Sequence, residues 1–167
     1  MKRPRPEPRA LLFELDGVLL DNSSGAGHPW LHDGVREMLA ALALAGYPLG
    51  VVTGMERRSW EAYEATFTPS RFAVVITADE TTAPAPDPAG MLAAARGLAL
   101  EPRHVAFIGA SPRGLAAARA ARMYVAAALW AGTAGGGEDP PPTIAGEEPE
   151  WQFARPAGVT RTFAAWC

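Results

Sequence analysis

Short apolar runs alternate with segments of helical periodicity along most of the chain. Five runs are apolar and rich in strand-forming residues, and each predicts a buried strand: residues 10–15, 48–53, 72–77, 104–109 and 123–128. Helical patterns fill the intervals, over residues 33–45, 56–66, 88–98 and 112–122. This alternation favours an α/β doubly wound fold, in which a parallel sheet carries helices on both faces.

The first helical segment illustrates the pattern. Apolar residues recur at i, i+3, i+4 and i+7 from Val35 to Leu42, which places them on one face of a helix. Asp33 is expected to cap the start of this helix. Gly46 stands where a C-terminal cap would lie.

The two ends of the chain and one internal stretch are less regular. Residues 1–9 are basic and proline-rich, so we expect a solvated tail before a single domain over residues 10–167. Runs of Gly and Pro predict a loop over residues 131–149. We expect a short strand after Trp151 and a helix after Pro156.

The composition supports a folded domain and argues against two classes of partner, nucleic acid and membrane surfaces. Hydrophobic residues make up 49% of the 167 residues and charged residues 20%, enough to bury a substantial core. A net charge of −3 gives no reason to expect nucleic acid or a membrane surface as a partner. No apolar stretch has the length of a signal peptide or a membrane span, and the single Cys167 cannot form an internal disulfide. We therefore expect a soluble, cytoplasmic protein.

Polar residues follow several predicted strands, at the edge where parallel sheets bind ligands. Glu14 and Asp16 come at the end of the first strand, and Gly17 allows a sharp turn there. The pair can hold a cation, divide the roles of nucleophile and acid, or simply face water, and the residues alone do not choose. Ser111 precedes a helix, where it is either an anion-binding group or a helix cap.

Four segments in order resemble the motifs of the haloacid dehalogenase superfamily. LLFELDGVLLDN, from Leu11, is similar to the first motif, a hydrophobic run followed by Asp-x-Asp-Gly-(Thr or Val)-Leu. The segments VVTG (51–54), APAPDP (83–88) and HVAFIGASPRGLAAARAA (104–121) are similar to the second, third and fourth motifs. The order and spacing agree over residues 10–130, which implies a Rossmann-like core and phosphatase ancestry.

The resemblance assigns roles to residues that are present. The first Asp of the family attacks phosphorus and binds Mg²⁺, and Glu14 stands at that position. The second Asp is the general acid and base, present here as Asp16. Thr53 and Gly54 match the second motif, whose Thr or Ser binds the phosphate. Ser111 matches the Ser of the fourth motif and is a further candidate phosphate-binding residue because of its place before a helix.

Three further positions depart from the family. Ala83 replaces the third-motif Lys, Ala110 a metal-binding Asp, and Gly114 the second acidic residue of the fourth motif. The extra methylene of Glu14 moves its carboxylate by about 1 Å, and errors of that size can cost about 100-fold in rate. With fewer carboxylates, Mg²⁺ is expected to bind weakly at Glu14 and Asp16.

Few positively charged side chains lie near the motifs, and little of the chain is available to cover the site. Arg57, Arg58 and Arg113 could reach a strand-end site, but exposed helix starts are the favoured interpretation. Only residues 22–32 lie where large family members insert a cap domain, so we expect a capless protein. Capless members of the family often oligomerise or act on large substrates, so a homo-oligomer is an expectation here.

The sequence leads to three hypotheses. The first is a degenerate phosphatase-like domain with weak or no hydrolase activity, whose partner is a phosphorylated small molecule or a protein. The second is a divergent Mg²⁺-dependent phosphohydrolase using Glu14 and Asp16, with Asp79 or Glu80 as a further ligand. The third is a receiver-like regulatory domain, which a helical turn and hairpin flap after the first strand would exclude.

Overall fold

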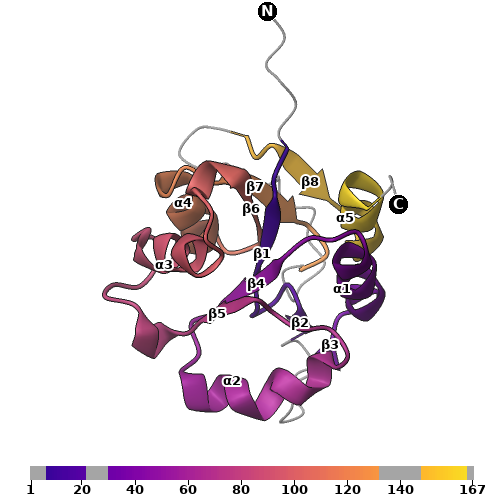
Figure 1. Ribbon diagram of the computed structural model, residues 1–167, viewed down its shortest axis with the longest axis horizontal. Coiled ribbons are helices and arrows are strands. Elements are labelled where there is room, and N and C mark those ends of the chain that lie inside the picture. Colours follow the sequence, from indigo (N-terminus) through magenta and orange to yellow (C-terminus); the bar gives the residue numbers. More distant parts are fainter. Residues whose placement is uncertain (1–6, 22–29, 132–147, 165–167) are drawn as a thin grey trace, which may run out of the picture.

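Six strands, each parallel to its neighbours, run through the centre of the molecule (Figure 1). The structure is a computed structural model that describes residues 7–21, 30–131 and 148–164. The strands are β1 (Ala10–Glu14), β4 (Leu49–Val52), β5 (Val74–Ile76), β6 (Val105–Gly109), β7 (Tyr124–Ala128) and β8 (Trp151–Phe153). The five strands predicted from the apolar runs are all present, and so is the short strand predicted after Trp151.

The order of these strands identifies the kind of α/β fold. Across the sheet it is β5-β4-β1-β6-β7-β8. Counted along the chain, this is the order 3-2-1-4-5-6 of Rossmann-type folds, whereas receiver domains have the order 2-1-3-4-5. The predicted doubly wound, Rossmann-like sheet is confirmed. The order reverses between β1 and β6, and ligands bind beside such a reversal.

Helices cover both faces of the sheet. They are α1 (Val35–Leu44), α2 (Arg57–Glu64), α3 (Ala89–Gly97), α4 (Pro112–Ala120) and α5 (Pro156–Phe163), with short 3-10 turns at Ala65–Phe67, Ala78–Glu80 and Pro102–His104. In Figure 1, α3 and α4 lie on one side of the sheet, and α1 packs beside α5 on the other. The helix predicted after Pro156 is therefore confirmed as α5.

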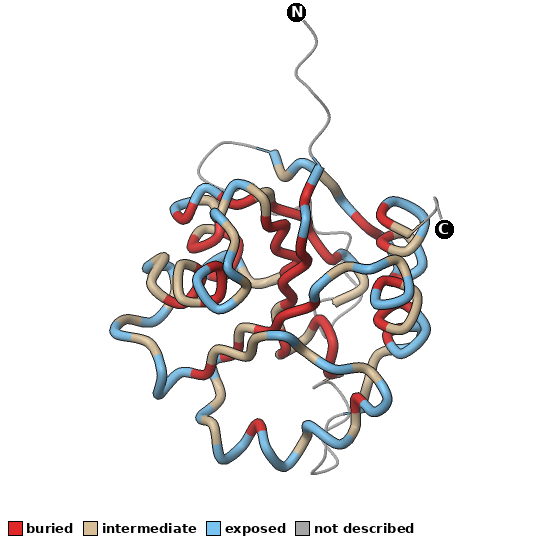
Figure 2. The backbone as a smooth tube through the Cα atoms, in the orientation of Figure 1, coloured by how far each residue is buried: buried red, intermediate tan, exposed pale blue. Residues whose placement is uncertain are grey.

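Alternate side chains of the central strands belong to two separate hydrophobic cores, one on each face of the sheet. Leu11 and Phe13 of β1 belong to the core under α1 and α5, whereas Leu12 belongs to the core with α3 and α4. All three side chains are fully buried. Figure 2 shows the buried positions gathered along the central strands and the inner sides of the helices. This period of two is the signature of a sheet covered on both faces.

The limits of α1 show one correct and one wrong prediction. The helix starts from Gly34, whose φ is +83°, with no side-chain capping bond, so the expected cap by Asp33 is wrong. The left-handed turn at Gly34 takes the place of a capping side chain in directing the chain into the helix. Gly46 (φ +86°) ends the helix as predicted. Its N–H and that of Tyr47 donate to backbone carbonyls in the pattern of a Schellman motif.

A turn and a small antiparallel ribbon follow β1 directly. The backbone N–H groups of Leu19 and Leu20 both donate to the carbonyl of Leu15, which forms a tight helical turn. The ribbon pairs β2 (Leu20–Asp21) with β3 (Trp30–Leu31). This turn and ribbon are the features that exclude the receiver-like hypothesis.

Some predictions fall outside the described residues. They are residues 1–6 of the basic tail, residues 22–29 of the segment in the cap position, residues 132–147 of the Gly- and Pro-rich loop, and Cys167. Between Thr53 and Ala83 the chain forms α2 and β5, which belong to the core, as a capless domain requires. Within the described part of the chain, no helix combines the length and the apolar character needed to cross a membrane.

Candidate functional site

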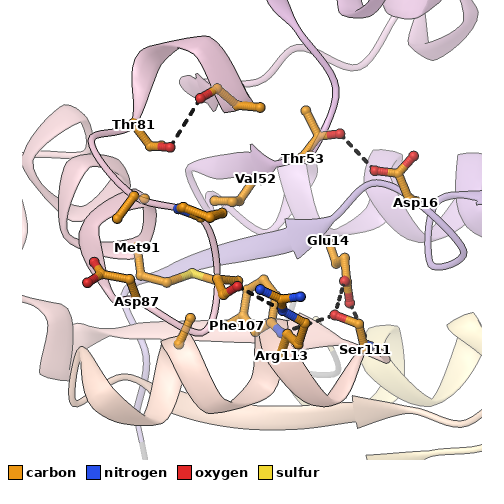
Figure 3. Close-up of a pocket in the computed structure, with 18 of the residues that line it drawn as sticks. Glu14, Asp16, Val52, Thr53, Thr81, Asp87, Met91, Phe107, Ser111 and Arg113 are labelled. Carbon is orange, nitrogen blue, oxygen red and sulfur yellow. Dashed lines mark hydrogen bonds between the residues drawn. The ribbon is translucent and has the colours of Figure 1, made fainter.

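A cavity of about 770 Å³ opens at the carboxyl ends of β1, β4 and β6 (Figure 3). It lies beside the reversal of strand order, where α/β sheets bind ligands. The residues to which the sequence assigns catalytic and phosphate-binding roles all line this cavity: Glu14, Asp16, Thr53, Gly54 and Ser111. Residues from three distant segments of the chain are therefore brought together, as the motif order predicts.

Glu14 is bonded to the start of α4. Its Oε2 accepts hydrogen bonds from the backbone N–H groups of Ala110, at 2.7 Å, and of Ser111, at 3.0 Å. The Ser111 hydroxyl donates to its Oε1. Both carboxylate oxygens are thus occupied by donors of the β6–α4 turn, and the positive end of the helix dipole further stabilises the negative charge.

Ser111 joins this carboxylate to the helix itself. Its side chain is the N-cap of α4, because its Oγ accepts a hydrogen bond from the N–H of Gly114 at 3.0 Å. The helix-cap interpretation of Ser111 is therefore confirmed. The anion that the Ser111 hydroxyl faces is the carboxylate of Glu14.

The space around Glu14 depends on small residues. A Cβ placed on Gly114 would lie 2.8 Å from Ser111 Oγ and 3.2 Å from Glu14 Oε1. At Gly109, a Cβ would lie 3.0 Å from Glu14 Oε2. Both distances to the carboxylate are tighter than ordinary contacts, so a side chain at position 114 would crowd Glu14 and Ser111 as they lie here. The departures from the family motifs at positions 14 and 114 are therefore neighbours in space, and Ala110 contributes its backbone N–H to the same group.

Asp16 and Thr53 form a second pair at the mouth of the cavity. The Thr53 hydroxyl donates to Asp16 Oδ2 at 2.8 Å and accepts from the N–H of Met55 at 3.0 Å. Thr53 itself is 94% buried, since only 6% of its surface is exposed. The hydroxyl proton is therefore directed at Asp16, which fixes the orientation of that carboxylate.

These carboxylates are a poor donor set for magnesium. Mg²⁺ prefers six oxygen ligands in octahedral geometry. Both oxygens of Glu14 already accept hydrogen bonds, so of these two carboxylates that of Asp16 remains to bind a metal. In the ranges that the structure describes, no three His, Cys, Asp or Glu side chains gather closely enough to hold a metal ion.

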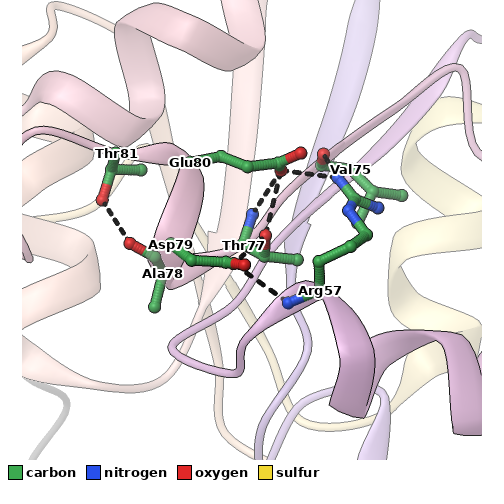
Figure 4. A network of polar contacts seen from close by, with 7 residues as sticks. All are labelled: Arg57, Val75, Thr77, Ala78, Asp79, Glu80 and Thr81. Atoms are coloured by element: carbon green, nitrogen blue, oxygen red, sulfur yellow. Dashed lines mark hydrogen bonds and ion pairs between the residues drawn. The ribbon is translucent and has the colours of Figure 1, made fainter.

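Asp79 and Glu80 do not line the cavity, although the second hypothesis used them as ligands. They belong to a polar network between β5 and α2 (Figure 4). Asp79 accepts from the Arg57 backbone N–H at 2.9 Å and from the Thr77 hydroxyl at 2.7 Å. The Thr77 bond, followed by the Arg57 bond, lowers the pKa of Asp79.

Glu80 makes the ion pair of this network. Its Oε2 accepts from Arg57 Nη2 at 2.5 Å and from the Thr77 backbone N–H at 3.1 Å. The Arg57 bond is the main reason that the pKa of Glu80 is lowered. Both acidic side chains therefore stabilise the start of α2 and the end of β5.

Arg113 lies in the first turn of α4, two residues after Ser111, and is exposed there, as the sequence interpretation favoured. It also lines the cavity, and its Nε donates to the carbonyl of Ala85 at 2.9 Å. The Oδ1 of Asp87, another lining residue, accepts from the N–H of Ala89 at the start of α3 at 2.8 Å.

The apolar part of the cavity was not predicted. Met91 of α3, Phe107 of β6 and Ala117 of α4 line it together with Val52 of β4. Three of these side chains are almost fully buried, so the sequence shows them only as core residues. Nothing in their spacing distinguishes a core position from a cavity wall.

A family profile and solved structures resemble this arrangement. The profile described as haloacid dehalogenase-like hydrolase matches residues 26–128. No curated protein sequence matches the chain. A HAD family hydrolase from Deinococcus radiodurans, solved with bound phosphate and sodium, has a TM-score of 0.77 at 17% identity, covering 97% of each chain.

Two further solved structures show the same fold. A HAD-superfamily hydrolase from Geobacter sulfurreducens has a TM-score of 0.71 at 17% identity, over 93% of this chain and 96% of that one. A predicted phosphoglycolate phosphatase from Haemophilus somnus has a TM-score of 0.63 at 25% identity, over 82% of this chain and 59% of that one.

Proposed function

The chain belongs to the haloacid dehalogenase-like hydrolase family, and from that premise we propose that it is a degenerate member with a binding or assembly role. It hydrolyses phosphate esters weakly or not at all. The observation that carries this proposal is the position of Glu14, whose carboxylate is bonded into the N-terminus of α4.

A nucleophile needs a carboxylate oxygen free to approach phosphorus in line. To reach a substrate, Glu14 must give up its hydrogen bonds to Ala110 and Ser111. Those donors are partly buried, and leaving such groups without a partner costs about 1–3 kcal/mol each. This cost adds to the barrier of the chemical step and supports a low or absent turnover.

Charge compensation is also weak at this site. Phosphoryl transfer depends on cations that offset the charge of the phosphate and the nucleophile. Ala83 lines the cavity at the position of the family lysine and supplies no charge. Arg113 is the cationic side chain among the described lining residues, and one of its donors is used by Ala85.

The alternative is a divergent Mg²⁺-dependent phosphohydrolase that uses Glu14 and Asp16. One observation favours it, because Glu14, Asp16 and Thr53 line a single cavity. The related Deinococcus hydrolase was solved with phosphate and sodium, so a phosphate site exists elsewhere in the family. In this alternative, Glu14 leaves α4 when a metal and substrate bind together.

A hydrolysis assay separates the two functions. The purified protein is tested on a panel of phosphate esters with Mg²⁺, Mn²⁺ or EDTA, beside Glu14→Ala and Asp16→Ala. We expect no metal-dependent turnover above the level shared by all three proteins. Turnover that needs metal and disappears in both variants would establish the divergent phosphohydrolase instead.

A further inference from the structure

The residues that line the cavity indicate which class of ligand it favours. We propose that it binds a small, largely apolar molecule that carries an amine, in place of a phosphate ester. This inference rests on the proposed binding role of the site. It names the chemical class that the present residues favour.

The interior of the cavity is apolar. Beyond the strand ends it extends over the sheet between α3 and α4, and its accessible apolar lining includes the partly exposed Val52 and Ala85. Gly90 and Gly114, on the two helices, bring no side chain into this space. A volume of about 770 Å³ lies within the range of about 300–1,000 Å³ that small-molecule sites occupy. Such a space favours a hydrocarbon body on the ligand.

The two helix starts beside the cavity already hold carboxylates of the protein. Glu14 accepts the N–H donors at the start of α4, and Asp87 accepts the N–H of Ala89 at the start of α3. Helix N-termini are the usual anion sites of α/β folds. Because these carboxylates already occupy the N–H groups, an incoming phosphate would meet few free donors at either helix start.

The charge of the lining selects the head group. Three carboxylates, of Glu14, Asp16 and Asp87, face one guanidinium, of Arg113. Figure 3 shows Asp87 on one side of the cavity and Glu14 and Asp16 on the other, with Arg113 between them. An excess of negative charge in a recess with apolar walls attracts a cation and repels an anion.

Asp16 is the anchor that we assign to the amine. Its Oδ2 accepts from Thr53, and its Oδ1 has no hydrogen-bond partner among the described residues. An ammonium group supplies donors that suit this free oxygen. Because Thr53 holds the carboxylate in one orientation, little side-chain freedom is lost when the amine binds.

The test compares three probes that share one hydrocarbon body: hexylamine, hexanol and hexyl phosphate. Each is titrated into the full chain and followed by two-dimensional NMR, with the methyl signals of Met91 and Ala117 reporting the apolar walls. We expect hexylamine to bind about tenfold more tightly than hexyl phosphate, with hexanol between them. Hexyl phosphate binding most tightly, or the absence of binding by hexylamine, would overturn the inference.

Two variants and a control locate the binding. Asp16→Asn keeps the shape but removes the charge, so it should weaken hexylamine severalfold and leave hexanol unchanged. Ala83→Leu narrows the cavity at a half-buried lining position and should weaken all three probes. Asp33→Asn changes an exposed aspartate that lines no part of the cavity and should alter none. Hexylamine affinity that survives Asp16→Asn would contradict the assigned anchor.

The same samples distinguish failure of this inference from failure of the proposed function. Release of phosphate from hexyl phosphate is measured separately with Mg²⁺. Turnover would contradict the degenerate function, whatever the order of affinities. Absence of both turnover and hexylamine binding would overturn the ligand class alone.

Discussion

The side chain of Glu14 lies where only a residue without a side chain at position 114 avoids a close contact. The carboxylate fills the start of α4, and a Cβ on Gly114 would meet both Ser111 Oγ and Glu14 Oε1. Two substitutions that look like independent losses therefore have one physical explanation. At this scale, the site is a set of internal hydrogen bonds whose members constrain one another.

We expect the two residues to be thermodynamically coupled. Gly114→Ala should lower the free energy of unfolding by about 1–3 kcal/mol, because the new Cβ crowds Ser111 while Glu14 holds the hydroxyl in place. In a Glu14→Ala background the hydroxyl can turn away, so the same change should cost less. Urea unfolding of both single variants and the double variant measures this difference. Strictly additive effects would show that the crowding is independent of Glu14.

The elements of this fold are largely predictable because their signals are local. Periods of two and 3.6 residues identify the strands and helices of the core from the sequence alone. The bond from Glu14 to Ala110 joins residues 96 positions apart, and no local pattern encodes it. The contact of Arg113 with Ala85 is equally non-local, since it depends on how the start of α4 lies against the loop before α3. Asp33 was misjudged because Gly34 turns the chain without a capping side chain.

Gly46 offers a test of how an element ends. Its φ is +86°, and an added Cβ would meet nothing within 4 Å, so only backbone conformation opposes a side chain there. Gly46→Ala should therefore lower the free energy of unfolding by about 1–2 kcal/mol. Gly46→Asn should cost less, because Asn adopts left-handed conformations more readily. Thermal unfolding of the two variants side by side compares these costs, and equal losses would contradict the conformational explanation.

The network between α2 and β5 predicts a pH dependence. The Arg57 hydrogen bond holds the pKa of Glu80 below its ordinary value near 4.5. A carboxyl whose pKa is lower in the folded state adds stability above the unfolded pKa and loses it as the pH falls through the folded pKa. Since 41% of the Glu80 side chain is exposed, the contribution should be under about 1 kcal/mol.

Glu80→Gln should accordingly reduce the loss of stability below about pH 4.5, while lowering stability slightly at neutral pH. Unfolding in urea from pH 7 to pH 3 follows both effects. Glu37→Gln, which changes an exposed glutamate of α1, is the matched control. An unchanged pH profile for Glu80→Gln would show that the ion pair with Arg57 does not persist in solution.

The whole molecule has the Rossmann-like fold of its family, but it has fewer of the carboxylates that the family motifs use to hold a metal. In a protein with a filled metal site, the ion binds the folded state only and raises its stability. Here hydrogen bonds within the chain supply the corresponding contacts around Glu14. The stability of the fold should therefore depend little on divalent cations.

We expect about 5 mM Mg²⁺ to raise the melting temperature of the protein by less than about 1 °C. The matched variant combines Glu14→Asp, Ala110→Asp and Gly114→Asp, which together restore a carboxylate cluster, and it should gain several degrees. Differential scanning calorimetry with MgCl₂ or with KCl of equal ionic strength makes the comparison. A large gain for the unmodified protein would show that Glu14 exchanges its helix contacts for a metal.

The contact between Glu14 and α4 also affects which sequences are reachable by mutation. Glu14→Asp alone shortens the side chain and leaves the donors of Ala110 and Ser111 without an acceptor. Gly114→Asp alone forces a second carboxylate against the first. We therefore expect either change alone to lower the stability of the fold before a metal site is complete. In evolutionary terms, a return to a metal site through these positions would require several mutations together.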